Sequence, residues 1–104
     1  MNMEELYDIL CKLNIEVAYH HFDSPVTSPF IVYYRTKSNN FKADDKVFEK
    51  INTYRIEIYT TKKDAMIEIF LENLLDENGF TYEIISETYI ESEKLYQVIY
   101  ELDI

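Results

Sequence analysis

Two periods of hydrophobic and polar residues run along the chain, and together they predict two helices and five strands. Residues 3–13 and 62–78 carry apolar side chains at helical spacing. Residues 15–22, 51–61, 80–90 and 95–102 alternate or are rich in β-branched and aromatic residues, as is typical of strands. Residues 30–34 are apolar at every position, which indicates a central strand covered on both faces.

The second helix has sequence signals at both ends. Thr61 is the expected N-cap, with Asp64 three residues later as an approximate capping box. Asn78 precedes Gly79, the only glycine of the chain. This predicts that the helix ends at Asn78 and that Gly79 adopts the left-handed conformation. The apolar stripe expected to face the sheet comprises Met66, Ile67, Phe70, Leu71 and Leu74. The residues expected on the opposite, solvated face are Glu68, Glu72 and Asp76.

The predicted element order is α-β-β-β-α-β-β within a single domain of residues 1–104. This order indicates an α+β fold, in which two helices pack on an antiparallel-dominated sheet. The short connection at residues 25–29 favours antiparallel pairing of the strands that it joins. Residues 37–50 are polar and are expected to form a long loop that can extend the strands at either end, and the loop is either functional or simply a mobile hairpin tip.

Composition narrows the class of protein. The net charge of −10, from 20 acidic and 10 basic residues, argues against nonspecific DNA binding and against an anionic membrane surface. The single cysteine, Cys11, excludes an intramolecular disulfide and suits a reducing compartment. Neither a signal peptide nor a long apolar segment is evident, so we expect a cytosolic protein.

Residues capable of catalysis form no recognisable motif. His20 and His21 are the only histidines, and as neighbours on a strand they are expected to face opposite sides and share no metal. Paired carboxylates are expected by chance among 20 acidic residues, and a Gly-rich phosphate loop is impossible with one glycine. The sequence therefore predicts no enzyme, no cofactor and no metal site.

The ten tyrosines favour a binding surface. Most fit amphipathic strand positions at the edge of a core, but two short helices cannot cover both faces of a sheet. The excess strand surface is therefore expected to be buried in an oligomer. The candidate interface residues are Phe41, Lys42, Asp44, Asp45, Tyr59, Tyr96 and Tyr100.

The chain resembles small tail proteins of prophages and long-tailed phages of Gram-positive bacteria, namely the tail completion or tail terminator family. The resemblance covers nearly the whole chain and lies in strand patterns. The stretches that carry it are VAYHHF at 17–22, PFIVYY at 29–34, ADD at 43–45, YRIEIYT at 54–60 followed by Lys63 and Asp64, TYIESEK at 88–94, and YQVIYE at 96–101.

This resemblance implies a structural protein of the virion tail, assembled in the host cytoplasm. Members of the family form a ring, typically of six subunits, that caps the head-proximal end of the tail tube and presents a surface to the head connector. The implied partners are further copies of the chain, the major tail tube protein and the head connector protein, with no specific nucleic-acid or membrane binding. The family has no cofactor and no catalytic residues.

Two other functions stay open at this point. The first is another small head–tail connector or head-completion component of similar fold. The second is an acidic cytosolic binding module whose carboxylates mimic nucleic acid, which would require acidic groups spaced like phosphates on one face.

Overall fold

A computed structural model describes residues 3–43 and 46–104. The element order is α1 (Met3–Cys11), β1 (Glu16–Tyr19), β2 (Phe30–Ala43), β3 (Lys46–Thr60), α2 (Ala65–Glu77), β4 (Tyr82–Ile90) and β5 (Leu95–Asp103). The five strands form one sheet in the order β1-β2-β3-β5-β4. Three of the four strand pairs are antiparallel, which confirms the predicted α+β class and element order.

The pairing of β1 with β2 is parallel, so the expected antiparallel neighbour is wrong. β1 ends at Tyr19, and His20 has a φ of 72°, which turns the chain out of the strand direction. Residues 20–29 are then free to run back to the level of Glu16, where β2 begins beside it. The parallel crossover was missed because the predicted strand 15–22 left only a short turn before residue 30.

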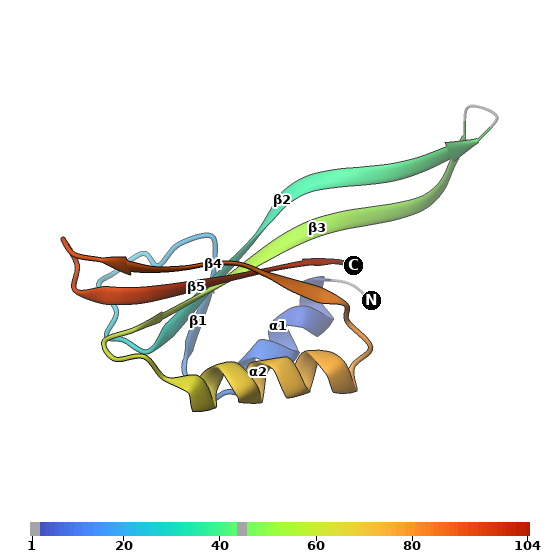
Figure 1. The fold of residues 1–104 in the computed structure, drawn as a ribbon. Helices are drawn as coiled ribbons and strands as arrows, with labels where there is room; N and C mark the ends of the chain where they lie inside the picture. Colours follow the sequence, from blue (N-terminus) through green and yellow to red (C-terminus); the bar gives the residue numbers. More distant parts are fainter. Residues whose placement is uncertain (1–2, 44–45) are drawn as a thin grey trace.

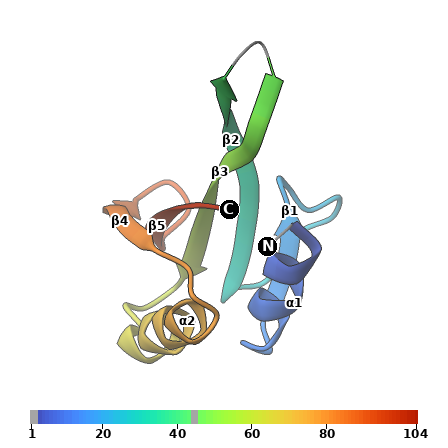
Figure 2. The same ribbon diagram turned by 90° about the vertical axis from the view of Figure 1, so that its right-hand side faces the viewer.

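Both helices lie on the same side of the sheet, as two views at right angles show (Figures 1 and 2). α1 lies below β1 and β2, while α2 lies below β4 and β5. Alternate residues of the three central strands point into this layer and form the core with the helices. The buried apolar residues are Leu6, Ile9, Leu10, Ile31, Tyr33, Tyr54, Ile56, Ile58, Leu71, Leu74, Leu75, Phe80, Val98, Tyr100 and Leu102.

β2 and β3 continue beyond the body of the protein as a two-stranded ribbon (Figure 1). Pairing of β1 with β2 stops at Tyr33, and β3 pairs with β5 as far as Thr53 and with Ile104 through Asn52, whereas β2 and β3 remain paired as far as Ala43 and Lys46. The radius of gyration of 14.9 Å exceeds the roughly 13 Å of a compact chain of this length. We call this extension, residues 36–43 and 46–52, the ribbon.

The ribbon replaces the long loop predicted over residues 37–50, which is therefore a correction. These residues carry no alternation of polar and apolar types, and a two-stranded ribbon held by backbone pairing needs none. Backbone pairing alone defines it, with Asn39 opposite Ile51 and Phe41 opposite Glu49. Irregular register between Arg35 and Lys37 marks the point where the ribbon leaves the body.

α2 begins one turn later than predicted. Its N-cap is Asp64, whose carboxylate accepts hydrogen bonds from the backbone N–H groups of Met66, at 3.1 Å, and Ile67, at 3.3 Å. Thr61 is not the cap. The predicted end is confirmed, since Gly79 follows the C-cap Asn78 with a φ of 77°.

α2 is also rotated relative to the predicted stripe. Its buried residues are Leu71, Leu74 and Leu75, whereas Met66 and Phe70 are 74 % and 52 % exposed. Two carboxylates expected in solvent instead have partners, one in the segment before the helix and one on the sheet. Glu68 pairs with Lys63, and Glu72 accepts hydrogen bonds from the hydroxyls of Tyr82 and Tyr100. These polar contacts explain the rotation, because they provide partners for carboxylates. A prediction based only on the apolar residues assigns the same carboxylates to the solvent-facing side of the helix.

Candidate interaction surface on the open sheet face

The sheet face opposite the helices has no helix over it (Figure 2). On three neighbouring strands, the residues that alternate with the buried core positions point to this face. The strand register places them side by side. We call this surface the open face. Its residues are Phe30, Val32 and Tyr34 on β2, Arg55, Glu57 and Tyr59 on β3, and Gln97, Ile99 and Glu101 on β5.

A carboxylate lies at the centre of the open face. Glu57 is only 9 % exposed, and both of its oxygens accept hydrogen bonds. The Tyr34 hydroxyl donates to Oε2 at 2.5 Å, and the Tyr59 hydroxyl donates to Oε1 at 2.6 Å. Gln97 Nε2 in turn donates to the Tyr59 hydroxyl at 2.7 Å. The network joins all three strands and fixes the orientation of both phenol rings.

The two phenols of this network are held protonated. Burial, and then the hydrogen bond to Glu57, raise the pKa of Tyr34 and of Tyr59. Beside them, Arg55 donates to Glu101 at 3.0 Å, and this bond raises the pKa of the guanidinium. The tyrosines are therefore hydrogen-bond donors in this network.

Aromatic rings extend the network toward one end of the open face. Phe30 stacks on Tyr59 with ring centroids 4.8 Å apart and an angle of 17° between the planes. Phe22, from the segment between β1 and β2, meets the edge of Phe30 at 5.6 Å. The open face thus carries a rigid aromatic end next to its polar centre, which is the composition favoured at protein–protein contacts.

The two histidines lie beyond β1 and are both exposed. Their Nδ1 atoms are 3.2 Å apart, so the expectation that they face opposite sides is wrong. The strand alternation on which it was based ends at Tyr19, and the positive φ of His20 turns the backbone. His21 also contacts Asp23 at 3.2 Å. Within residues 3–43 and 46–104, no group of three or more possible ligands is placed to hold a metal ion.

The predicted interface residues fall in different places. Tyr59 belongs to the open face, whereas Tyr96 packs against Tyr89, with ring centroids 4.9 Å apart, on the helix-covered side of the sheet. Tyr100 is fully buried under α2 and is a core residue, which corrects its assignment as a contact residue. Phe41 and Lys42 lie on the β2 strand of the ribbon. Asp44 and Asp45 lie outside the described residues.

Sequence reasoning missed the central members of the network, namely Tyr34, Arg55, Glu57 and Gln97. The pattern YRIEIY contains a usable signal, because Arg55, Glu57 and Tyr59 alternate with buried residues and so share one face. The partners from β2 and β5 could not be identified, since they depend on register across strands far apart in the chain.

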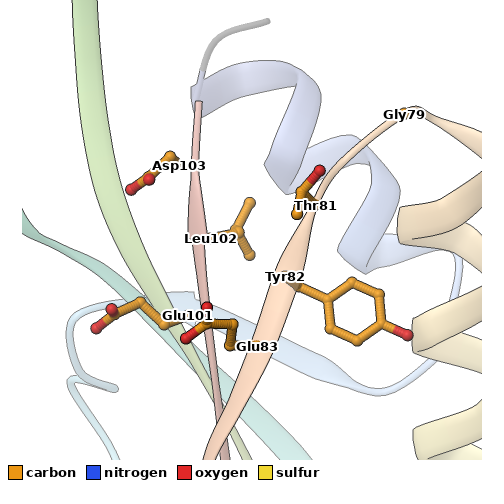
Figure 3. A pocket seen from close by; sticks show the side chains of 7 residues that line it. All are labelled: Gly79, Thr81, Tyr82, Glu83, Glu101, Leu102 and Asp103. Carbon is orange, nitrogen blue, oxygen red and sulfur yellow. The ribbon is translucent and has the colours of Figure 1, made fainter.

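A shallow pocket of about 370 Å³ lies where the end of β5 meets the start of β4 (Figure 3). Glu83, Glu101 and Asp103 line it, and Tyr82 points away from the carboxylates toward α2. Two of these carboxylates have partners, since Glu101 binds Arg55 and Asp103 accepts a hydrogen bond from Thr53 at 2.6 Å. We call these three residues, Glu83, Glu101 and Asp103, the acidic margin of the sheet.

Comparison with protein-family models and with curated proteins finds no match to this chain. Among the described residues, no helix has the length and hydropathy needed to cross a bilayer.

Proposed function

We propose that the protein is a non-catalytic structural subunit of a phage tail, which assembles into a ring at the head-proximal end of the tail tube. One observation carries the proposal: an uncovered polar and aromatic sheet face is continuous with a ribbon that projects from the body. The resemblance of the strand patterns to tail completion proteins supplies the identity of the assembly.

The open face supports an assembly role because its side chains are already ordered. Tyr34, Glu57 and Tyr59 hold one another in place, so a partner that binds there loses little side-chain entropy. Stacking of Phe30 on Tyr59 adds a flat apolar area beside the polar centre. Such pre-organised faces suit repeated contacts between identical subunits.

The ribbon supports the same role by its reach. Beyond Ser38 on β2 and beyond Asn52 on β3, no third strand pairs with the ribbon among the described residues, so both strands have an open backbone edge there. A neighbouring subunit or the tail tube protein could pair with either edge, which is a common mode of strand addition. The core residues that the structure describes all lie in the body, so a variant with a shortened ribbon can test assembly separately from folding.

The net charge of −10 fits a ring through which DNA passes, because like charges repel and prevent tight binding of the polyanion. On this proposal the acidic margin of Glu83, Glu101 and Asp103 faces the channel. Mapping these residues to the outer rim of an assembled ring would contradict that placement.

The proposal is tested by mixing the purified protein with a purified tail tube protein and imaging the ends of the tubes by negative-stain electron microscopy. We expect caps at one end and tubes of limited length. A matched variant replaces residues 40–50 by Asn-Gly, which closes the Asn39–Ile51 pair with a two-residue turn. This variant is expected to fold normally, by circular dichroism, and to lose capping.

Two results would contradict the proposal. The first is a wild-type protein that leaves tube length unchanged and forms no ring alone or with the tube. The second is binding to a purified head connector without any effect on tubes, which would favour the head–tail connector function.

A further inference from the structure

The outer surface of α2 is divided into an apolar half and an acidic half. Met66, Ile69 and Phe70 are 74 %, 51 % and 52 % exposed near the N-terminal end of the helix. Asn73, Asp76 and Glu77 are exposed toward the C-terminal end, and the exposed Lys62 precedes the helix. α2 is the outermost element on its side of the molecule, so this surface has no covering layer (Figure 1).

The charges on this surface are poorly satisfied within one copy. Asp76 and Glu77 lie at the C-terminal end of α2, where the helix dipole disfavours negative charge, and the last turn contains no basic residue. In the described part of the chain, Lys62, Asp76 and Glu77 form no ion pair, whereas the neighbouring Lys63 pairs with Glu68 and Glu87. A partner that brings positive charge to the C-terminal end would therefore stabilise the helix.

We propose that α2 is the contact of a symmetric dimer, in which the α2 helices of two copies pack antiparallel about a two-fold axis. The two-fold axis is placed between Ile69 and Phe70, so that each residue of one helix lies opposite the residue of the other helix at the same distance from the axis. In this register apolar residues meet near the axis and opposite charges meet at the ends. Ile69 meets Phe70 of the second copy and Met66 meets Asn73. Lys62, which precedes the helix, lies at the end of the contact where Glu77 of the second copy is placed. Each pair occurs twice, as an isologous contact requires.

Charge selects a second copy in this orientation over other occupants. The antiparallel arrangement places Lys62 and the positive end of one helix dipole beside Asp76 and Glu77 of the other. A parallel arrangement would set acidic residues against acidic residues. The surface is thus complementary to a second copy of itself, which supplies the positive charge that the C-terminal end of α2 lacks.

A groove beside the helix provides room for the contact. A pocket of about 270 Å³ lies between the C-terminal end of α1 and the N-terminal end of α2. Leu13, Ile67 and Phe70 supply its apolar lining. Met66 and Phe70 border this groove and also belong to the proposed contact, so the groove lies at its margin.

The dimer is independent of the proposed ring. A two-fold contact closes after two copies, whereas a ring needs a different, head-to-tail contact. The variants that test the dimer change only residues of α2 and Lys62 just before it. Loss of the dimer with tube capping intact would therefore overturn neither inference.

Sedimentation equilibrium at low salt, over a concentration series, tests the dimer. The wild type is expected to shift from 12.5 kDa to twice that mass as concentration rises. The single reversals Lys62→Glu and Glu77→Lys are each expected to weaken dimerisation about tenfold, because like charges then face each other twice. The double variant restores opposite charges and is expected to return to within about threefold of the wild type.

Two controls isolate the contact. Ile69→Asp is expected to abolish the dimer with an unchanged circular dichroism spectrum, because Ile69 is outside the core. Ile85→Asp changes a residue on β4 that is 41 % exposed and is expected to leave the dimer intact. The proposal is overturned by a folded wild type that stays monomeric at all concentrations, by a dimer indifferent to the α2 variants, or by a double variant no better than either single one.

Discussion

Tyr100 on β5 donates a hydrogen bond from its hydroxyl to Oε2 of Glu72 on α2, with an oxygen–oxygen distance of 2.7 Å. Tyr82 on β4 donates to the other carboxylate oxygen at 3.3 Å. One carboxylate on the helix therefore fixes the position of two strands. Because Tyr100 is fully buried, this bond sets how α2 sits on the sheet and which of its sides faces outward.

Removing this hydroxyl is expected to destabilise the protein without creating a cavity. Tyr100→Phe leaves Glu72 with one weaker donor and should lower the free energy of unfolding by about 1–2 kcal/mol, as for a hydrogen bond to a charged acceptor. Urea denaturation measures the loss. The control Glu93→Gln changes an exposed residue in the turn between β4 and β5 and should stay within about 0.5 kcal/mol of the wild type. Equal stability of both variants would show that the bond is unimportant.

Glu57 is expected to matter more for stability than Glu101, although both lie on the open face. Glu57→Ala removes the acceptor of two tyrosine hydroxyls at a position 9 % exposed, and should cost about 2 kcal/mol. Glu101→Ala breaks an ion pair with Arg55 that is partly screened by solvent, and should cost less than about 1 kcal/mol. Thermal and urea unfolding of both variants compare the two. The reverse order would mean that the network does not order the face.

Gly79 is expected to resist substitution for a reason of backbone conformation alone. Its φ of 77° is in the left-handed region, while a Cβ built there would meet nothing within 4 Å. Gly79→Ala should therefore cost about 1–2 kcal/mol from strain and not from a clash. Gly79→Asn should cost less, since asparagine tolerates this conformation better. A harmless alanine, measured by urea denaturation, would contradict this account of the helix end.

Alkaline pH is expected to destabilise the fold through its tyrosines. Burial raises the pKa of Tyr33 to about 12, and burial also raises the pKa of Tyr59 and Tyr100. An unfolded tyrosine ionises near pH 10, so the stabilisation of the neutral form is complete below about pH 10 and is lost as pH rises toward the folded pKa. Urea midpoints should be constant up to about pH 9.5 and then fall.

Ultraviolet absorbance of the phenolate form provides the matching measurement for this pH dependence. Part of the absorbance should appear only as the protein unfolds, and Tyr33→Phe should reduce the slope of stability against pH. A single titration step identical in folded and urea-unfolded protein would contradict the raised pKa values.

The sequence predicted the parts of the fold in which one residue pattern has one structural meaning. Gly79 marked the end of α2, because a glycine directly after a helical pattern is typical of the left-handed conformation that ends helices. The seven elements also appear in the predicted order. Predictions failed where a neighbour distant in sequence decides the outcome. The orientation of α2 depends on Tyr82 and Tyr100 reaching Glu72, and the open-face network depends on register across β2, β3 and β5.

The ribbon was missed for a different reason. Its polar composition resembles a loop, because the hydrophobic pattern reports burial and not backbone pairing. The strands there are held by backbone hydrogen bonds, which every residue type except proline can make. A prediction from the hydrophobic pattern cannot identify such a segment unless a turn motif such as Asn-Gly lies between the two strands. Residues 37–50 contain no Asn-Gly.

β2 and β3 each belong to two environments along one continuous strand. Near Ile31 and Ile58 they are paired on both sides with further strands, whereas beyond Ser38 and Asn52 they pair only with each other in the described part of the chain. Local opening can therefore begin at the far end of the ribbon and stop at the body. The limit between the part that opens locally and the part that unfolds with the core then lies within β2 and β3, and not between two separate elements. The far end can change partners while the near end keeps its shape.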